Sequence, residues 1–198
     1  KNNYSSIKLV KAKNYSLQDT KIESNALYEV YKKVKVIYDD DQNKTDIPFI
    51  QANSFERIIS LMEILSEDQK STEEIAEIMQ FEIRQSDYYY NAGRYLGLFE
   101  KRSSKGKKSI KKVSLTKLGK EVVKLKYKER QLKLVELILK HDIFNKLFEK
   151  VYHSGIMPTP EEIQDIMRKN NVCNKGQINR RSSSVYSWLK WIFNLQNI

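Results

Sequence analysis

The chain has 198 residues, 40% of them hydrophobic and 11% aromatic, which suffices for one or two domains with a folded core and excludes wholesale disorder. A single cysteine and two histidines exclude an internal disulfide framework and a multi-thiolate metal site. Lysine and arginine number 36 against 25 aspartate and glutamate residues, so the net charge of +11 predicts an anionic partner, with nucleic acid first and a membrane surface second.

The excess positive charge is concentrated in one part of the chain. Residues 101–157 hold 17 basic and 5 acidic side chains, whereas residues 51–100 hold 4 and 10. The densest basic run comprises Lys101, Arg102, Lys105, Lys107, Lys108, Lys111 and Lys112. Such a run is typical both of solvated lysine-rich loops and of surfaces that contact nucleic acid, so the surrounding pattern must decide between them.

The sequence contains no recognisable membrane or export segment. No apolar run reaches the roughly eighteen residues that a membrane span needs, and no charged, apolar, small-residue leader opens the chain. A cytoplasmic protein with no membrane partner is therefore expected. Because the chain begins at Lys1 rather than Met, we expect it to be a fragment or a processed form.

Residues 1–47 are expected to be an N-terminal segment or linker with one or two strands. The strand prediction depends on the β-branched and aromatic residues Tyr28, Val30, Val34, Val36, Ile37 and Tyr38. The triplet at 39–41 is interpreted as a solvated polar turn, because no second carboxylate group follows at a spacing suited to a metal.

Residues 48–157 are expected to form a winged-helix domain with a helical extension. Capping-box patterns at 53–56 and 71–74 predict the starts of two helices. A third helix is predicted to end at Leu96, with Gly97 in the left-handed conformation after it. The inner face of this third helix is expected to hold Gln85 or Ile83, Tyr89, Ala92 and Leu96.

The hydrophobic period changes from 3.6 towards 2 after Gly97. This change predicts strands at 98–101 and 109–115, joined by a turn rich in Ser, Lys and Gly. Three helices followed by such a hairpin have the order of a winged helix-turn-helix, and the basic run lies on the wing. The chain from 117 to 152 is predicted to be helical, with a break near His141, which we interpret as an ordinary surface or packing residue.

Residues 158–198 are expected to form a second helix-turn-helix unit. Thr159, Pro160 and Glu162 combine an N-cap, a proline in the first turn and a capping-box glutamate. A turn at 174–176 separates this helix from a final helix, in which Trp188 is expected to lie in the core. The predicted fold class is mainly α, with a small β wing between two helix-turn-helix units.

The second helix of a helix-turn-helix presents its N-terminal half to the major groove of DNA. In the first unit that half contains Arg84, Gln85, Ser86, Asp87, Tyr88 and Asn91. Arginine can bond guanine, asparagine or glutamine can bond adenine, and aspartate can accept from cytosine, so these are candidate DNA-binding residues. Stacking of single-stranded bases on residues 88–90 is the weaker alternative, because Tyr89 is needed in the core.

The wing and the second unit provide the remaining candidates. Cations of the wing are expected to contact phosphates, which anchor a protein without reading sequence. The wing candidates are Arg102, Lys105, Lys107 and Lys108, and the candidates in the second unit are Gln177, Arg180 and Arg181. The alternative for Arg180 and Arg181 is an exposed helix face paired with carboxylates.

The sequence shows no catalytic site. We find no carboxylate–lysine nuclease pattern, no glycine-rich phosphate loop and no Cys–His pair. No catalytic residue, no metal ligand and no cofactor is therefore expected in this chain.

Five segments resemble the tandem winged-helix recognition region of type II restriction endonucleases. They lie at 47–58, 84–89, 95–98, 115–119 and 180–192. The most specific feature is the pairing of an Arg-Gln-Ser-Asp-Tyr-Tyr helix with an Arg-Arg helix that ends in Trp-x-x-Trp-Ile. The resemblance implies target-site recognition through Arg84, Gln85, Asp87, Tyr88, Asn91, Arg180 and Arg181, while a separate domain or subunit holds the nuclease carboxylates and their Mg²⁺.

The sequence thus predicts a protein that binds double-stranded DNA sequence-specifically as the recognition part of a restriction endonuclease. Cleavage by this chain alone is not expected, and a homodimer is possible under this hypothesis. A transcriptional regulator or plasmid replication initiator with tandem winged helices is the first alternative. A protein-interaction module whose lysines only confer solubility is the second.

Overall fold

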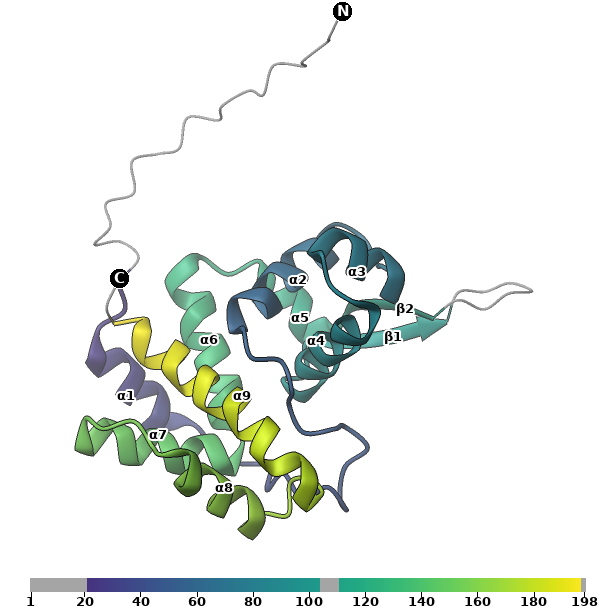
Figure 1. The fold of residues 1–198 in the computed structure, drawn as a ribbon. Helices are drawn as coiled ribbons and strands as arrows, with labels where there is room; N and C mark the ends of the chain where they lie inside the picture. Colours follow the sequence, from purple (N-terminus) through teal and green to yellow (C-terminus); the bar gives the residue numbers. More distant parts are fainter. Residues whose placement is uncertain (1–20, 104–110, 197–198) are drawn as a thin grey trace, which may run out of the picture.

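The structure is a computed structural model that describes residues 21–103 and 111–196. Within these ranges the chain is mainly helical, as predicted, and its one sheet is a two-stranded antiparallel hairpin. The elements are α1 (Ser24–Lys33), α2 (Phe55–Glu67), α3 (Thr72–Met79), α4 (Ile83–Tyr95), β1 (Phe99–Ser103), β2 (Lys111–Leu115), α5 (Lys117–Val123), α6 (Tyr127–Leu139), α7 (Asp142–Ser154), α8 (Pro160–Lys169) and α9 (Lys175–Asn194). Figure 1 shows α2–α5 and the hairpin beside a second group formed by α1 and α6–α9.

Local capping interactions begin α2 and α3. Ser54, rather than the expected Asn53, caps α2 and accepts a hydrogen bond from the Arg57 amide. The predicted capping box of α3 is confirmed, because Ser71 and Glu74 each bond the other's backbone amide. These caps satisfy amides that the first turn of a helix otherwise leaves unpaired.

Gly97 ends α4 with the predicted left-handed conformation, at a φ of 72°. The Leu98 amide donates to the Gly93 carbonyl over 2.8 Å, which is the six-to-one bond of a Schellman motif. The chain then enters β1, whose residue Phe99 pairs with Leu115 of β2. The α4 helix and the hairpin are thereby joined through a single tight turn.

The inner face of α4 differs by one position from the predicted one. Tyr89, Ala92 and Leu96 are buried as expected, but Ile83 and Gln85 are exposed and Ser86 is buried instead. Ser86 is followed by buried residues at the third, fourth and seventh positions after it, which is the spacing of one helical face. Ser86 therefore lies on the core-facing side of α4, which does not favour its expected role in DNA contact.

The strands expected within residues 28–38 are replaced by α1 over most of that stretch. Leu27, Tyr31 and Val34 recur at helical spacing, and α1 packs on α6 and α7. Tyr31 lies 5.4 Å from the ring of Phe148 on α7. Packing of this face overrides the local β propensity of the valines. Extended backbone follows α1, with an isolated bridge from Tyr38 to residue 141.

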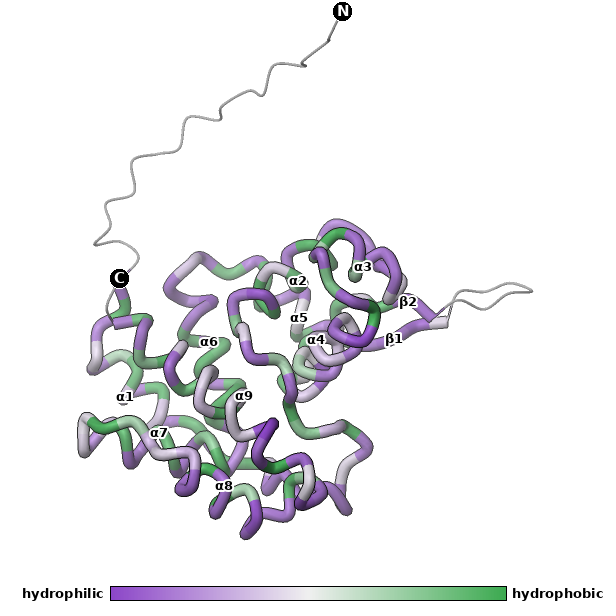
Figure 2. The backbone as a smooth tube through the Cα atoms, viewed as in Figure 1, coloured by the Kyte–Doolittle hydropathy of each residue, from purple (hydrophilic) through white to green (hydrophobic). Residues whose placement is uncertain are grey.

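The long helical stretch after the hairpin breaks twice, after α5 and again at the predicted position between α6 and α7. Figure 2 shows apolar and polar residues alternating along α1, α6, α7 and α9, as amphipathic helices require. One hydrophobic core includes residues from α1 through the end of α9.

Trp188 of α9 lies at the centre of this core. Its ring is fully buried, 5.0 Å from Phe55 of α2 and 5.6 Å from Phe144 of α7. The capping box of Thr159 and Glu162 starts α8 as predicted, and α8 packs on α9. Residues 158–196 therefore share their core with the preceding helices.

Candidate nucleic-acid interface

The N-terminal halves of α4 and α9 meet at an exposed cluster of one tyrosine and two arginines. Arg180 of α9 donates a hydrogen bond to the hydroxyl of Tyr88 on α4 over 3.1 Å. The guanidinium carbons of Arg84 and Arg180 lie 5.5 and 5.8 Å from the centroid of the Tyr88 ring. Both arginines are exposed and Tyr88 is half-buried, so the cluster can contact a partner without unfolding. We call it the arginine–tyrosine cluster.

Arg181, the residue after Arg180, is half-buried. Its guanidinium donates a hydrogen bond to the Phe49 carbonyl, and its Nε is buried with no hydrogen-bond partner in the described part of the chain. Burial lowers the pKa of the Arg181 guanidinium. The structure thus gives Arg181 the role of anchoring the segment before α2, which does not favour its expected role in DNA contact.

Three of the other predicted residues on α4 are in different environments. Gln85 is exposed, but its side chain accepts the Glu82 amide in a capping box, so it is engaged in starting the helix. Asp87 accepts a hydrogen bond from Lys101 of β1 over 3.1 Å. Asn91 is half-buried on the next turn. The outer face of α4 therefore presents arginine, tyrosine and an aspartate that is already paired with a cation.

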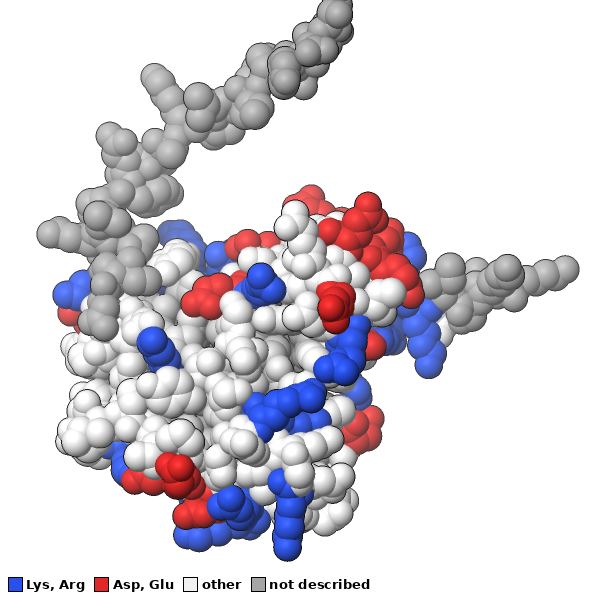
Figure 3. Space-filling view, in the orientation of Figure 1, with Lys and Arg blue, Asp and Glu red and all other residues white. Residues whose placement is uncertain are grey.

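The hairpin adds cations beside α4. Arg102 is exposed and paired with Glu100, and Lys111 is exposed at the start of β2. The predicted phosphate contacts Lys105, Lys107 and Lys108 lie outside the described residues. On α9, Gln177 is exposed in the first turn, one turn before Arg180. Figure 3 shows Lys and Arg side chains gathered over α4 and the N-terminal part of α9 on this face.

Acidic residues mark the neighbouring surface of α3. Glu73 and Glu77 are exposed on α3, and Glu82 is exposed just before α4. Figure 3 shows Asp and Glu side chains over α3, next to the basic face. The charge is therefore directional, since a polyanion is attracted to the α4–α9 side and repelled from the α3 side.

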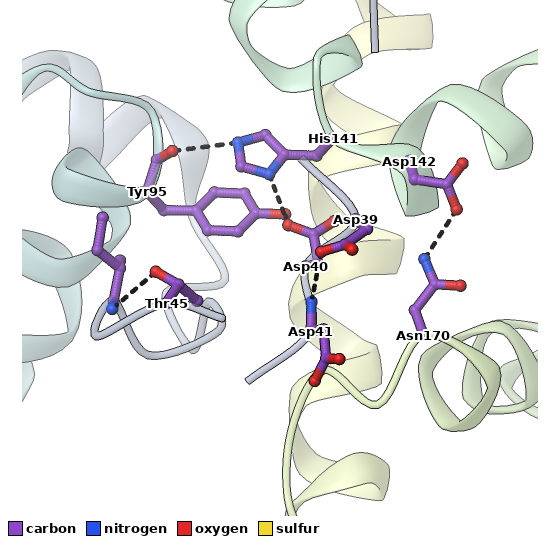
Figure 4. Close-up of polar contacts among 9 residues, drawn as sticks. Asp39, Asp40, Asp41, Thr45, Tyr95, His141, Asp142 and Asn170 are labelled. Carbon is purple, nitrogen blue, oxygen red and sulfur yellow. Dashed lines mark hydrogen bonds and ion pairs between the residues drawn. The ribbon is translucent and has the colours of Figure 1, made fainter. Parts of the chain in front are cut away.

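A second polar feature lies at the opposite end of α4. The Asp40 carboxylate oxygen Oδ1 accepts a hydrogen bond from the Tyr95 hydroxyl over 2.8 Å and lies 2.6 Å from His141 Nδ1. His141 Nε2 lies 3.1 Å from the Tyr95 carbonyl oxygen. Figure 4 shows these three side chains converging. We call them the buried network.

Burial and stacking enclose the buried network. The His141 ring lies between Tyr95, at 3.6 Å, and Tyr38, at 4.6 Å, measured between centroids. Burial and the Asp40 carboxylate raise the pKa of Tyr95 well above its usual value. A cavity of about 660 Å³ adjoins it, with Phe49, Arg94 and Lys44 among its lining residues.

Sequence reasoning missed this network, since the triplet at 39–41 was expected to be solvated. Asp40 is 55 residues from Tyr95 and 101 from His141, so no local pattern signals their contact. Asp40 also has a left-handed backbone, at a φ of 62°, which aspartate tolerates better than most residues. His141 was interpreted as an ordinary surface or packing residue, and the structure shows that it is buried.

Residues 34–53, which we call the strap, connect α1 to α2 and touch both candidate reading helices. At α4 the strap contributes Asp40 to the buried network and Asp46 to an ion pair with Arg94. At α9 the Ala52 carbonyl accepts the Trp188 indole N–H over 2.8 Å, and Asn53 accepts the Ser184 hydroxyl over 2.6 Å.

The residues that the structure describes contain no group of three or more His, Cys, Asp or Glu arranged to hold a metal ion. None of the helices in the described ranges has the length and apolar content that crossing a bilayer requires. Burial raises the pKa of the Cys173 thiol, which lies in the turn between α8 and α9.

Comparisons with known proteins give one family match. The family model described as "Domain of unknown function (DUF7226)" matches residues 57–197. The matched region contains α4, the hairpin and α9, and hence all residues of the arginine–tyrosine cluster. No curated protein and no solved structure matches the chain.

Proposed function

We propose that this chain, which belongs to the DUF7226 family, binds double-stranded DNA sequence-specifically. In this proposal α2–α4 and the hairpin act as a winged helix, and α8–α9 act as a second helix-turn-helix unit. The observation that supports it best is the arginine–tyrosine cluster. Arg84 lies on α4 and Arg180 lies on α9, and Arg180 is 92 residues from Tyr88 in the sequence. Both arginines nevertheless lie over the ring of Tyr88 on an exposed face.

The cluster has the chemistry that base recognition requires. An arginine guanidinium matches the O6 and N7 acceptors of guanine with two parallel hydrogen bonds, and each such contact is worth about 1–3 kcal/mol of discrimination. The Tyr88 ring restricts where each guanidinium lies before DNA is bound, which reduces the entropy lost on binding. Arg84 and Arg180 are the proposed base-reading residues.

The hairpin supplies the sequence-independent part of the affinity. Arg102 and Lys111 are exposed on β1 and β2, and Lys101 of β1 pairs with Asp87 of α4 beside them. Cations in such a position neutralise phosphates and release counterions, which strengthens binding to any duplex and makes it depend on salt.

We further propose that this binding serves target recognition in a type II restriction endonuclease, on the resemblance of the α4 and α9 sequences to that class. Mg²⁺ would then belong to a separate nuclease domain or subunit. Incubating the chain with a bound duplex and Mg²⁺ tests this part, and the expected result is binding without cleavage. Clean cuts by the chain alone would overturn this division of labour.

Fluorescence anisotropy with labelled duplexes at several salt concentrations tests DNA binding. Arg84→Ala should weaken binding to the preferred sequence by about 1–3 kcal/mol while leaving random duplex almost unaffected. Lys111→Ala should weaken all duplexes alike and make the slope of log K against log salt shallower by about 0.9.

Lys190→Ala is the matched control, because Lys190 is exposed at the far end of the helix that contains Arg180. This variant should bind like the unmodified chain. Absence of binding to any duplex, or equal effects of Arg84→Ala and Lys190→Ala, would contradict the proposal.

A further inference from the structure

We infer that α4 and α9 together recognise one short, uninterrupted and asymmetric DNA segment, rather than two half-sites separated by a turn of the duplex. This inference rests on the proposed function and defines the class of its substrate. It follows from how the two candidate reading helices are placed relative to each other.

The spacing of the two arginines is small compared with a helical turn of DNA. Their guanidinium carbons lie 5.5 and 5.8 Å from the same ring centroid, so they are separated by at most the sum of these distances, about 11 Å. At a rise of about 3.4 Å per base pair, this spans roughly three base-pair steps. Recognition helices that address separate half-sites lie about 34 Å apart.

The strap holds this spacing in place. It is fastened to α4 by the Asp40–Tyr95 hydrogen bond and the Asp46–Arg94 ion pair, and to α9 by the Ala52–Trp188 hydrogen bond. Two of these three contacts involve buried side chains, Tyr95 and Trp188. Since breaking contacts to buried polar groups is costly, the helices cannot separate to span a longer site without loss of stability.

The single chain also supplies two different reading surfaces. The α4 surface presents the exposed residues Ile83 and Arg84 and the half-buried Tyr88, whereas the α9 surface presents the exposed residues Lys175, Gln177 and Arg180. Different donors and acceptors recognise different bases, so the sequence read by one copy has no internal two-fold symmetry. Even if two copies were to bind side by side, each would read a complete block of its own.

Two consecutive experiments test this inference. Bound duplexes are first selected from a library with a randomised central region, and the selected sequence is then scanned by base substitution. The chain should select one continuous block of bases. In the scan, each arginine variant should abolish the effect of base substitutions on binding at the positions which that arginine reads. The positions found with Arg84→Ala and those found with Arg180→Ala should lie within about four base pairs of each other. Insertion of one base pair between them should weaken binding by about 5- to 150-fold.

Tyr88→Phe provides a second variant that keeps the ring but removes the hydroxyl bonded to Arg180. It should weaken the preference at the Arg180-dependent position and leave the Arg84-dependent position unchanged. Thermal unfolding of each variant confirms that the fold is retained.

If the positions that depend on Arg84 and those that depend on Arg180 lay in separate blocks about ten base pairs apart, the inference would be overturned while the proposed function stands. Failure of the unmodified chain to bind any duplex would overturn the proposed function and this inference together.

Discussion

Replacing Tyr95 with phenylalanine removes one hydroxyl from the buried network and leaves the ring in place. The hydroxyl donates to Asp40 over 2.8 Å, and Tyr95 is only 7% exposed. A hydrogen bond to a carboxylate contributes about 1.5–3 kcal/mol, so Tyr95→Phe should lower the free energy of unfolding by about 2 kcal/mol near pH 8. Tyr38→Phe, on the other side of His141, is the control, because Tyr38 is 48% exposed and should change stability by less than about 0.5 kcal/mol.

The cost of Tyr95→Phe should fall at high pH. Burial and the Asp40 carboxylate raise the pKa of Tyr95 in the folded state well above 10, whereas the unfolded chain titrates near 10. The stabilisation by Tyr95 is therefore complete below pH 10 and is lost as pH rises above it, by about 1.4 kcal/mol per pH unit. A difference of about 2 kcal/mol at pH 8 should shrink to about 0.6 kcal/mol at pH 11.

Urea denaturation followed by circular dichroism at pH 8 and pH 11 measures both quantities. Fitting each curve with a common slope gives the free energies of unfolding of the unmodified chain and the two variants. Equal effects of Tyr95→Phe and Tyr38→Phe at pH 8, or a difference that does not shrink at pH 11, would refute this reasoning.

Three further predictions concern packing, thiol reactivity and the anchoring arginine. A Cβ at Gly93 would lie 1.8 Å from the Phe99 ring, so Gly93→Ala should destabilise the chain by about 1–3 kcal/mol in the same denaturation assay. A Cβ at Gly176 would meet no atom within 4 Å, so Gly176→Ala should be neutral or should stabilise the chain by up to about 1 kcal/mol. Cys173 should react with Ellman's reagent at pH 8 at least about ten times more slowly in the folded than in the urea-unfolded chain, because burial raises its pKa and blocks access; equal rates would contradict its burial. Arg181→Ala should lower the melting temperature by several degrees through loss of its buried hydrogen bond, and an unchanged melting temperature with altered base preference would show that it contacts DNA instead.

Signals that act within a few residues predicted much of the fold. The capping boxes at 71–74 and 159–162 and the glycine at 97 fix helix ends through bonds to nearby backbone groups, so the sequence shows them directly. The hairpin after the three helices followed from the change in hydrophobic period after Gly97. These features depend little on the rest of the chain.

Features set by distant contacts could not be predicted in the same way. Residues 28–38 were expected to form strands because their β-branched and aromatic side chains favour β structure, but residues 28–33 belong to α1, which packs on α6 and α7. The small side chain of Ser86 lies on the buried inner face of α4. Because serine is polar, the sequence did not indicate this burial. Arg181 looked equivalent to Arg180, but one position on a helix turns a side chain by about 100° and here moves it from solvent to the strap.

The arginine–tyrosine cluster combines both situations. Arg84 and Arg180 were each proposed as DNA contacts from their positions at the beginning of helices. Their convergence on Tyr88 depends on the packing of α9 against α2 and on the strap, which no spacing within either segment encodes.

The most direct test of sequence-specific DNA binding compares two dissociation constants, both measured by anisotropy at about 150 mM salt. The test quantity is the dissociation constant for a scrambled duplex divided by that for the duplex selected from the random library. Sequence-specific binding predicts a ratio of at least about a thousand. Arg84→Ala and Arg180→Ala should each reduce this ratio by about 5- to 150-fold, and Lys190→Ala should leave it unchanged. A ratio near one, or a ratio insensitive to both arginines of the cluster, would contradict it.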